Sequence, residues 1–243
     1  MYSASEVNLL AESNATRGAR RRARTRTSIL DAAERAFAES GYRRTRMEDV
    51  AEQADVAIGS IYGHFGNKDG LYLALVERAV ELFGRYLRQA YRPEWSPLEQ
   101  VVACGDAYLR FHIEHPGAFR FLAFDGVETD APVADPELRA RVGAGVDALI
   151  SEFEAKIQEA IDAGEARALD SRLVGRFLWG AWNGVVALGL RSDGIALGDS
   201  EIEAALQQAR DIVLAGLCAP SARDAAGLPL AQLRATTSPA EAG

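Results

Sequence analysis

The chain has 243 residues, a net charge of −8 and 48% apolar residues, enough for a small module plus a larger core. No apolar run approaches the ~20 residues of a membrane helix, and the N-terminus lacks the apolar segment of a secretory signal. Cys104 and Cys218 lie far apart and fit no metal motif. We therefore expect a cytoplasmic protein with reduced thiols, no metal or cofactor and no membrane partner.

The charge is unevenly distributed along the chain. Residues 17–46 hold ten arginines against three acidic residues, whereas residues 69–243 hold 16 basic and 26 acidic residues. A basic end attached to an acidic body suits a protein that brings one end to the phosphates of a nucleic acid. Residues 1–24 are predicted to form a disordered basic arm, for which a merely solvated tail is the alternative interpretation.

The first predicted helix covers residues 27–40. Its apolar residues recur at helical spacing, with Ile29, Ala33 and Phe37 facing inward. Gly41 is expected to end it in a left-handed conformation.

Two short helices joined by a tight turn follow. Thr45 and Glu48 have the spacing of a reciprocal capping box, which predicts the start of the first of them. Its inward stripe is Met47, Val50, Ala51 and Ala54. The second helix, residues 58–64, buries Ile61 and carries small residues on its outer side, so its backbone can approach a large partner. This pattern predicts a helix-turn-helix whose second helix enters a DNA major groove.

The surrounding sequence is more specific than a helix-turn-helix alone. ILDAAERAFAESGYRRTRMEDVAEQADV, followed by IGSIYGHFGNKDGLY, resembles the N-terminal domain of the TetR (tetracycline-repressor-like) family of bacterial transcription regulators. The resemblance is close over residues 27–75. It departs from the family at Asp55, where glycine is common in the turn, and at Ala57, where serine or threonine commonly provides a cap worth about 1 kcal/mol.

The rest of the chain has the pattern of an all-α protein. Further helices are predicted over residues 68–91, 97–115, 119–124, 137–163, 171–190 and 200–217, with a loop at 125–136. Together with the resemblance, this predicts an N-terminal three-helix helix-turn-helix domain at 25–69 and a larger helical effector-binding and dimerisation domain at 70–219. Residues 220–243 have few large apolar groups and are predicted to be a disordered tail.

Phosphate contacts are implied by the resemblance at Tyr62, His64 and Lys68. Lys68 also lies in the first turn of a helix, whose positive end favours phosphate. A packing role for Tyr62 and a local capping role for His64 are the alternatives.

Base contacts are expected from the outer face of the second short helix. The candidates are Ala57, Ile58, Gly59, Ser60 and Gly63. None is an Asn, Gln or Arg, so thymine methyl contacts are more plausible than extensive hydrogen-bond readout. Thr45 and Arg46 lie at the start of the first short helix. Arg24 and Arg26 belong to the arm, from which arginines can enter a narrow minor groove.

Residues 171–190 are the predicted dimer interface, together with residues 200–217. The first segment contains four glycines, each of which costs a helix about 1 kcal/mol, and such glycines usually permit the close approach of another backbone. The proposed interface residues are Phe177, Gly180, Ala181, Gly184 and Leu188. Packing within one subunit is the alternative. A two-fold homodimer would fit a palindromic operator in double-stranded DNA.

An effector pocket is implied by the family layout, without a motif of its own. The candidate lining residues are Tyr108, Phe111, His112, Phe119, Phe124, Trp179, Trp182 and Asn183, which are also ordinary core candidates. Arg110 or Arg176, if inward, would indicate an anionic ligand. The predicted function is therefore a dimeric repressor released from its operator by an unidentified small molecule. A regulator without such a switch, or an activator, is the alternative. No catalytic motif supports an enzyme.

Overall fold

The computed structural model describes residues 4–122 and 136–239, with side chains from residue 17 onward. Within these residues the regular elements are all helices, which confirms the predicted all-α fold class. The chain divides into two compact units, one of residues 1–76 with 128–139 and one of residues 77–127 with 140–243. The division falls after residue 76, within a helix.

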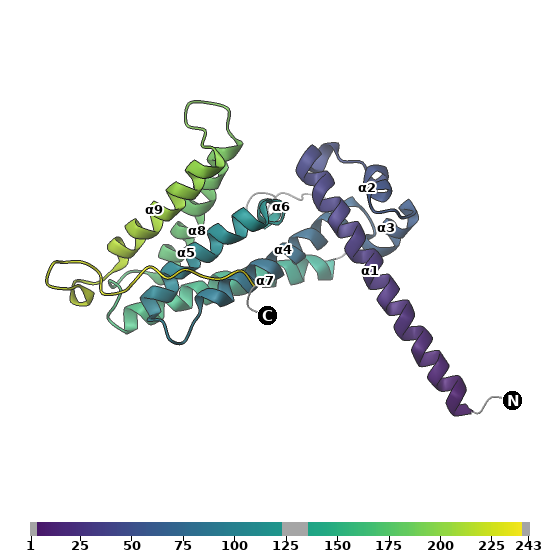
Figure 1. Cartoon of the computed structure of the whole chain (residues 1–243), viewed down its shortest axis with the longest axis horizontal. Coiled ribbons are helices and arrows are strands. Elements are labelled where there is room, and N and C mark those ends of the chain that lie inside the picture. The colour runs from purple at the N-terminus through teal and green to yellow at the C-terminus, as the bar shows by residue number, and fades with distance from the viewer. Residues whose placement is uncertain (1–3, 123–135, 240–243) are drawn as a thin grey trace. The chain divides into compact units, whose positions relative to one another are not determined.

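The first unit contains the helix-turn-helix (Figure 1). Its helices are α1 (Ala4–Arg44), α2 (Met47–Gln53), α3 (Ile58–Phe65) and the start of α4 (Lys68–Ala90). The predicted inward residues form its core. Ile29, Ala33, Phe37, Met47, Val50, Ala51, Ala54, Ile61 and Phe65 are all buried.

Residues 4–24 are helical, so the prediction of a disordered arm is wrong there. The segment holds five alanines and five arginines, which are good helix formers, and it has no proline. It also continues a helix that is already nucleated by its own core, so extending that helix needs no new nucleus. The basic arm is therefore a helical extension of α1.

The end of α1 differs from the predicted capping box. Gly41 interrupts the helix with a φ of 75°, as expected of a helix terminator. Thr45 is only 4% exposed, and its hydroxyl lies 3.0 Å from the Ala36 carbonyl and 2.8 Å from the Gly41 carbonyl. It thus satisfies carbonyl groups at the end of α1, while Arg46 occupies the N-cap position of α2 without a side-chain cap. The capping-box prediction for Thr45 is wrong.

The turn between α2 and α3 has the strain that the sequence suggested. Asp55 is the one non-glycine residue with a positive φ (53°) in the described part of the chain. Ala57 is the N-cap of α3 and provides no side-chain hydrogen bond. Asn67, by contrast, caps α4, because its carboxamide oxygen accepts from the Gly70 N–H at 2.8 Å.

The second unit is a helical bundle built on the remainder of α4. Its other elements are α5 (Pro97–Glu114), α6 (Pro116–Arg120), α7 (Pro136–Asp162), α8 (Ser171–Ala187), η2 (Leu188–Leu190), α9 (Asp199–Leu217) and η3 (Pro220–Ala222). Most of these bounds lie within a few residues of the predicted ones; the short helix predicted at 119–124 corresponds to α6. The predicted loop at 125–135 and Phe124 lie outside the described residues.

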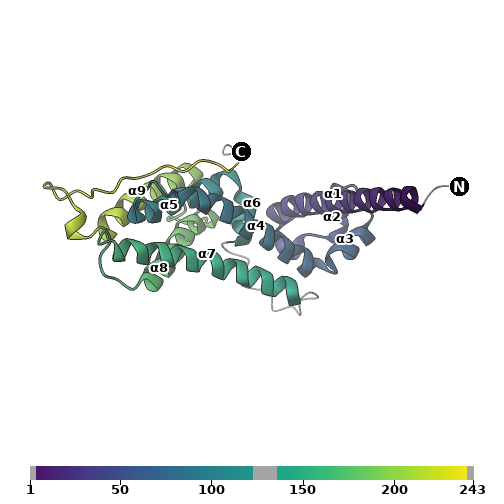
Figure 2. The ribbon, with the colours of Figure 1, turned by 90° about the horizontal axis from the view of Figure 1, so that it is seen from below.

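The C-terminal segment is ordered along the bundle, which corrects the prediction of a disordered tail for residues 220–239. Figures 1 and 2 show it running back over α5. Its composition gives it little core of its own, but it satisfies buried carboxylates of α5. Asp106 accepts both the backbone N–H and the hydroxyl of Thr236. Polar contacts to the bundle, and not apolar burial, hold the segment in place.

Candidate nucleic-acid interface and ligand cavity

The outer face of α3 is bare, as the sequence predicted. Ala57, Gly59 and Gly63 are exposed, and Ile58 and Ser60 are half-buried. A Cβ atom built on Gly59 or Gly63 would meet nothing within 4 Å. Packing within the chain therefore does not require glycine at these two positions.

Basic residues lie beside the end of α3. The guanidinium of Arg26 sits 5.5 Å from the centre of the Phe65 ring. Burial lowers the pKa of His64, and the positive charges of Arg22 and Arg26 lower it further. His64 is therefore neutral at pH 7. Tyr62 is 46% exposed, so its hydroxyl is available to a phosphate.

Lys68 lies at the start of α4, close to the same surface. Its ammonium donates to the Thr45 carbonyl at 2.6 Å and lies 4.7 Å from the centre of the Tyr42 ring. Desolvation lowers the pKa of Lys68, and the Asp69 carboxylate opposes this effect. Tyr42 in turn donates to Asp69. The ammonium is thus held in one position beside the helix N-terminus.

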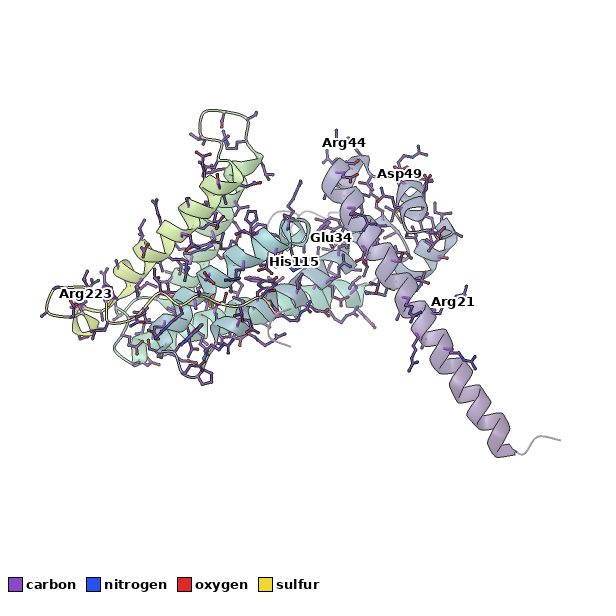
Figure 3. The ribbon with its side chains drawn as sticks, in the orientation of Figure 1. Arg21, Glu34, Arg44, Asp49, His115 and Arg223 are labelled. Carbon is purple, nitrogen blue, oxygen red and sulfur yellow. The ribbon has the colours of Figure 1, made fainter. Side chains whose placement is uncertain are left out.

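The remaining candidates for DNA contact differ in exposure. Arg24 and Arg46 are exposed, although Arg46 lies 3.7 Å from the carboxylate of Glu48. Arg21 lies on the part of α1 that extends past α2 and α3 (Figure 3). Thr45 is buried, and its hydroxyl is engaged with carbonyls of α1, so its side chain is not exposed for a contact with DNA.

A cavity lies in the second unit, between α4, α5, α7, α8 and α9. Its empty space, including the part open to solvent, is about 550 Å³. It is lined by Phe83, Leu87, Val101, Val102, Cys104, Gly105, Tyr108, Leu149, Ile150, Phe153, Leu178, Trp179, Trp182, Arg210 and Val213.

Most polar groups of the lining are paired or uncharged, but the Trp182 Nε1 and the Arg210 Nε are buried without a hydrogen-bond partner among the described residues. The Tyr108 hydroxyl donates to the Asn183 side chain at 2.6 Å, and burial raises the pKa of Tyr108. Burial raises the pKa of the Cys104 thiol to about 12, so it is uncharged. The Arg210 guanidinium is paired with Asp106 at 2.8 Å. The cavity therefore offers a hydrocarbon surface without a net charge.

The sequence predicted part of this lining. Tyr108, Trp179 and Trp182 line the cavity, and Asn183 holds the Tyr108 hydroxyl. The other described candidates do not line it and are packed elsewhere. Phe111 and Phe119 are fully buried core residues, and His112 packs edge-on against Phe119 at 4.7 Å.

Arg210 is the cavity residue that sequence reasoning missed. It occupies the inward stripe of α9 with Ile202, Leu206 and Leu214, at intervals of four residues. An arginine on an apolar stripe could have marked the position. The arginines considered instead lie outside the cavity lining, where Arg110 pairs with Asp106 and Glu114, and Arg176 pairs with Glu154.

The glycines of α8 divide into two groups. A Cβ on Gly175 would lie 3.0 Å from Glu154, and one on Gly189 would lie 2.7 Å from Ile202, so these two serve packing within the chain. A Cβ on Gly180 or Gly184 would meet nothing within 4 Å. These two glycines are exposed and form a strip of the α8 surface that carries no side chains.

An exposed apolar face accompanies that strip. Phe177 is 71% exposed, one turn from Gly180, and Ile212 on the neighbouring α9 is also 71% exposed. Ala181 and Leu188 are half-buried. Among the described helices, Ser171–Leu190 alone is long and apolar enough to cross a membrane, with 22% of the stretch buried, which corrects the expectation that no segment qualifies. One such helix is weak evidence for a membrane span.

Family models match both units. The model described as bacterial regulatory proteins, tetR family, matches residues 29–75, and the tetracyclin repressor-like C-terminal domain matches residues 101–213. This chain belongs to the TetR family. The helix-turn-helix and the cavity-bearing bundle described above are thus the two domains of a TetR-family regulator.

Individual relatives agree with this TetR-family assignment. The transcriptional activator FasR of Mycolicibacterium smegmatis is 32% identical over 123 residues, which cover 51% of this chain and 54% of FasR. The regulator TtgR of Pseudomonas putida is 51% identical over 57 residues, 24% of this chain and 27% of TtgR. The matched part of the chain thus covers about half of the length of FasR and about a quarter of the length of TtgR. The ketosteroid regulator KstR2 of Mycobacterium tuberculosis is 27% identical, with a TM-score of 0.61 over 79% of this chain and 94% of that one.

Proposed function

We propose that this protein is a dimeric, sequence-specific DNA-binding repressor of the bacterial cytoplasm that a small apolar molecule releases from a palindromic operator. The observation that carries the proposal is the bare outer face of α3 beside a group of cations. Gly59 and Gly63 leave room that the fold does not use, while Arg26 and Lys68 are held next to the same helix end. Close backbone approach with flanking phosphate anchors is how a recognition helix binds a major groove.

The dimer is proposed from the exposed strip of α8. Phe177, Gly180 and Gly184 recur one turn apart on one face, and Ile212 of α9 is exposed as well. A large exposed apolar patch on a soluble domain usually marks an interface. A two-fold axis along this strip would bring two identical recognition helices to two half-sites.

The effector class follows from the cavity. A ligand that enters it meets the rings of Phe83, Phe153 and Trp179 and finds no unpaired charge among the described lining residues. Burying an ionised carboxylate there would cost several kcal/mol, because the one cation in the described lining, Arg210, is already compensated by Asp106. We infer an uncharged, largely apolar effector.

Helix α4 offers a route from effector to DNA. Phe83 and Leu87 line the cavity, and Lys68 lies at the N-terminus of the same helix. A ligand that binds one arrangement of α4 more tightly shifts the population toward it. The proposed result is a spacing of recognition helices that no longer fits major grooves ~34 Å apart.

The ligand proposal is tested with a matched pair of compounds, 1-dodecanol and dodecanoate. The neutral alcohol should raise the melting temperature and lower operator affinity, and the carboxylate should bind at least about tenfold more weakly. Tighter binding of the carboxylate would contradict the inferred effector class. Transcription in vitro from a selected operator distinguishes a repressor from an activator. The distinction matters because the relative FasR is named as an activator.

A further inference from the structure

The C-terminal residues 231–239, which we call the C-terminal strap, follow a chain reversal beyond α9. Arg223 and Pro229 form a short antiparallel bridge, and Gly227 has a φ of 81°, which favours glycine. The Arg223 guanidinium donates to the carbonyls of Gly227 and Ala215, at the end of the bundle marked in Figure 3. The reversal directs the strap back along α5 (Figures 1 and 2).

Two buried carboxylates of α5 hold the strap. Glu99 and Asp106 are each 5% exposed. Asp106 accepts the N–H and the hydroxyl of Thr236 at 2.7 and 2.8 Å. Glu99 accepts the N–H of Gln232 at 2.9 Å and pairs with Arg234 at 2.9 Å. Burial alone would raise the pKa of Glu99, but these donors hold it below its usual range. The carboxylates thus exchange water for charge-assisted hydrogen bonds from the strap.

The donors of the strap are spaced to match the carboxylates of α5. Glu99 and Asp106 are seven residues apart, a rise of about 10.5 Å along α5. Gln232 and Thr236 are four residues apart, which spans about 13 Å in an extended chain. Both carboxylates can therefore be satisfied at once by one extended segment.

The far end of the strap reaches α4. The Thr237 hydroxyl donates to the Gln89 side chain at 3.3 Å. Ser238 is buried and hydrogen-bonds with the Tyr86 hydroxyl. The strap thus crosses from the start of α5 to the C-terminal end of α4, and both of these helices also contribute to the cavity wall.

Arg210 connects the strap to the cavity. Its Nη2 donates to the Arg234 carbonyl at 2.6 Å, and its Nη1 donates to the Asp106 carboxylate at 2.8 Å. The same side chain lines the cavity, where its stem would lie 3.2 Å from a Cβ on Gly105. One side chain is therefore both a wall of the cavity and a support of the strap.

We propose that the strap is an intramolecular regulatory element, bound by Glu99 and Asp106 and tightened through Arg210 when the cavity is occupied. A ligand packed on the Arg210 stem excludes water, and hydrogen bonds strengthen where the local dielectric constant is lower. By linkage, the bound strap raises ligand affinity by the same factor. The C-terminal family model ends at residue 213, before the strap. The attachment of the strap to α5 does not depend on the proposed function. The coupling between the strap and the cavity rests on the proposed function, in which the cavity binds an effector.

Attachment is tested by hydrogen exchange of residues 231–239 in the full chain. Thr236→Val and Thr237→Val form a matched pair, since the two threonines are adjacent but only Thr236 donates to a buried carboxylate. Thr237→Val removes just the exposed, uncharged 3.3 Å hydrogen bond to Gln89 and should have a much smaller effect. Loss of a hydrogen bond to a buried carboxylate should speed strap exchange on the order of tenfold in Thr236→Val, and less than about twofold in Thr237→Val. Arg234→Ala, which removes the pair with Glu99, should act like Thr236→Val and serves if that variant fails to fold. Equal rates in all variants would overturn the attachment.

Coupling is tested with the neutral fluorescent probe N-phenyl-1-naphthylamine. Saturating probe should slow strap exchange in the unmodified chain, and Thr236→Val should raise the probe's Kd by the same factor, with Thr237→Val unchanged. Strap exchange that is unchanged or faster with probe bound overturns the coupling. Failure of the probe to bind any variant refutes the coupling and the cavity's proposed role, while the exchange rates of the matched pair still decide attachment.

Discussion

The ammonium of Lys68 donates a hydrogen bond to the Thr45 carbonyl over 2.6 Å, which connects the first turn of α4 to the junction between α1 and α2. An ammonium has three N–H donors, so this contact leaves donors for a phosphate oxygen. The side chain is thereby positioned before DNA arrives, and less side-chain entropy is lost on binding.

Gly59→Leu should separate folding from DNA binding. A side chain at this position meets nothing in the free protein, and leucine favours a helix over glycine by up to about 1 kcal/mol. The melting temperature should therefore stay the same or rise, while operator affinity falls because the backbone cannot approach the groove. Thermal denaturation and fluorescence anisotropy measure the two effects. Normal operator affinity in Gly59→Leu would show that α3 does not enter the groove.

Operator binding should strengthen as the pH falls below neutrality. Desolvation and nearby arginines hold the pKa of His64 below 6.5 in the free protein, and a phosphate beside it would raise that pKa. Binding then takes up a proton, so affinity rises as the pH falls between the bound and free pKa values. Anisotropy titrations from pH 5 to 8 measure this effect. His64→Gln should lose the pH dependence, and if it keeps it, His64 does not contact phosphate.

Gly184→Leu should disrupt assembly without disrupting the fold. Its Cβ points into open space, so the chain itself has room, but overpacking a subunit interface costs about 1–3 kcal/mol at each crowded site. Sedimentation should show monomers with normal helix content. Gly175→Leu is the contrasting variant, because it clashes with Glu154 and should destabilise the bundle. A Gly184→Leu protein that stays dimeric would place the interface elsewhere.

Deleting residues 1–24 should leave the fold intact and weaken DNA binding. The described residues 17–24 are exposed, so their loss removes little buried surface, while five arginines are removed. The slope of log affinity against log salt should become shallower, because fewer phosphate contacts release fewer counterions. If the deletion variant and the full chain have the same operator affinity and the same salt slope, these arginines do not contribute to DNA binding.

Local patterns predicted the helices better than they predicted polar partners. The apolar spacing in α2 and α3, the Gly41 break and the Asp55 turn depend on near neighbours in sequence, and all four were predicted. Thr45 was misassigned because the carbonyls of the end of α1 compete with the N-terminus of α2 for its hydroxyl. Local sequence does not reveal which competitor wins.

The cavity and the tail depend on contacts across the whole chain. Arg210 and Asp106 are 104 residues apart, and Thr236 contacts Asp106 across 130 residues. Arg210 stands out on the apolar stripe of α9, but local sequence identifies neither its partner nor that of Thr236. Composition alone therefore indicated a disordered tail, whereas the carboxylates of α5 determine its course.

The most direct test of the account is the selection of bound duplexes from a random pool by the full chain, followed by titration of Lys68→Ala on the selected site. The account predicts a palindromic site bound with steep salt dependence. Lys68→Ala should weaken binding to every sequence alike and reduce the salt slope by about one. Lys156→Ala, the only other lysine in the chain, is the matched control and should bind normally. Selection that yields no shared sequence, or equal losses in the two lysine variants, would contradict sequence-specific DNA binding by this helix-turn-helix.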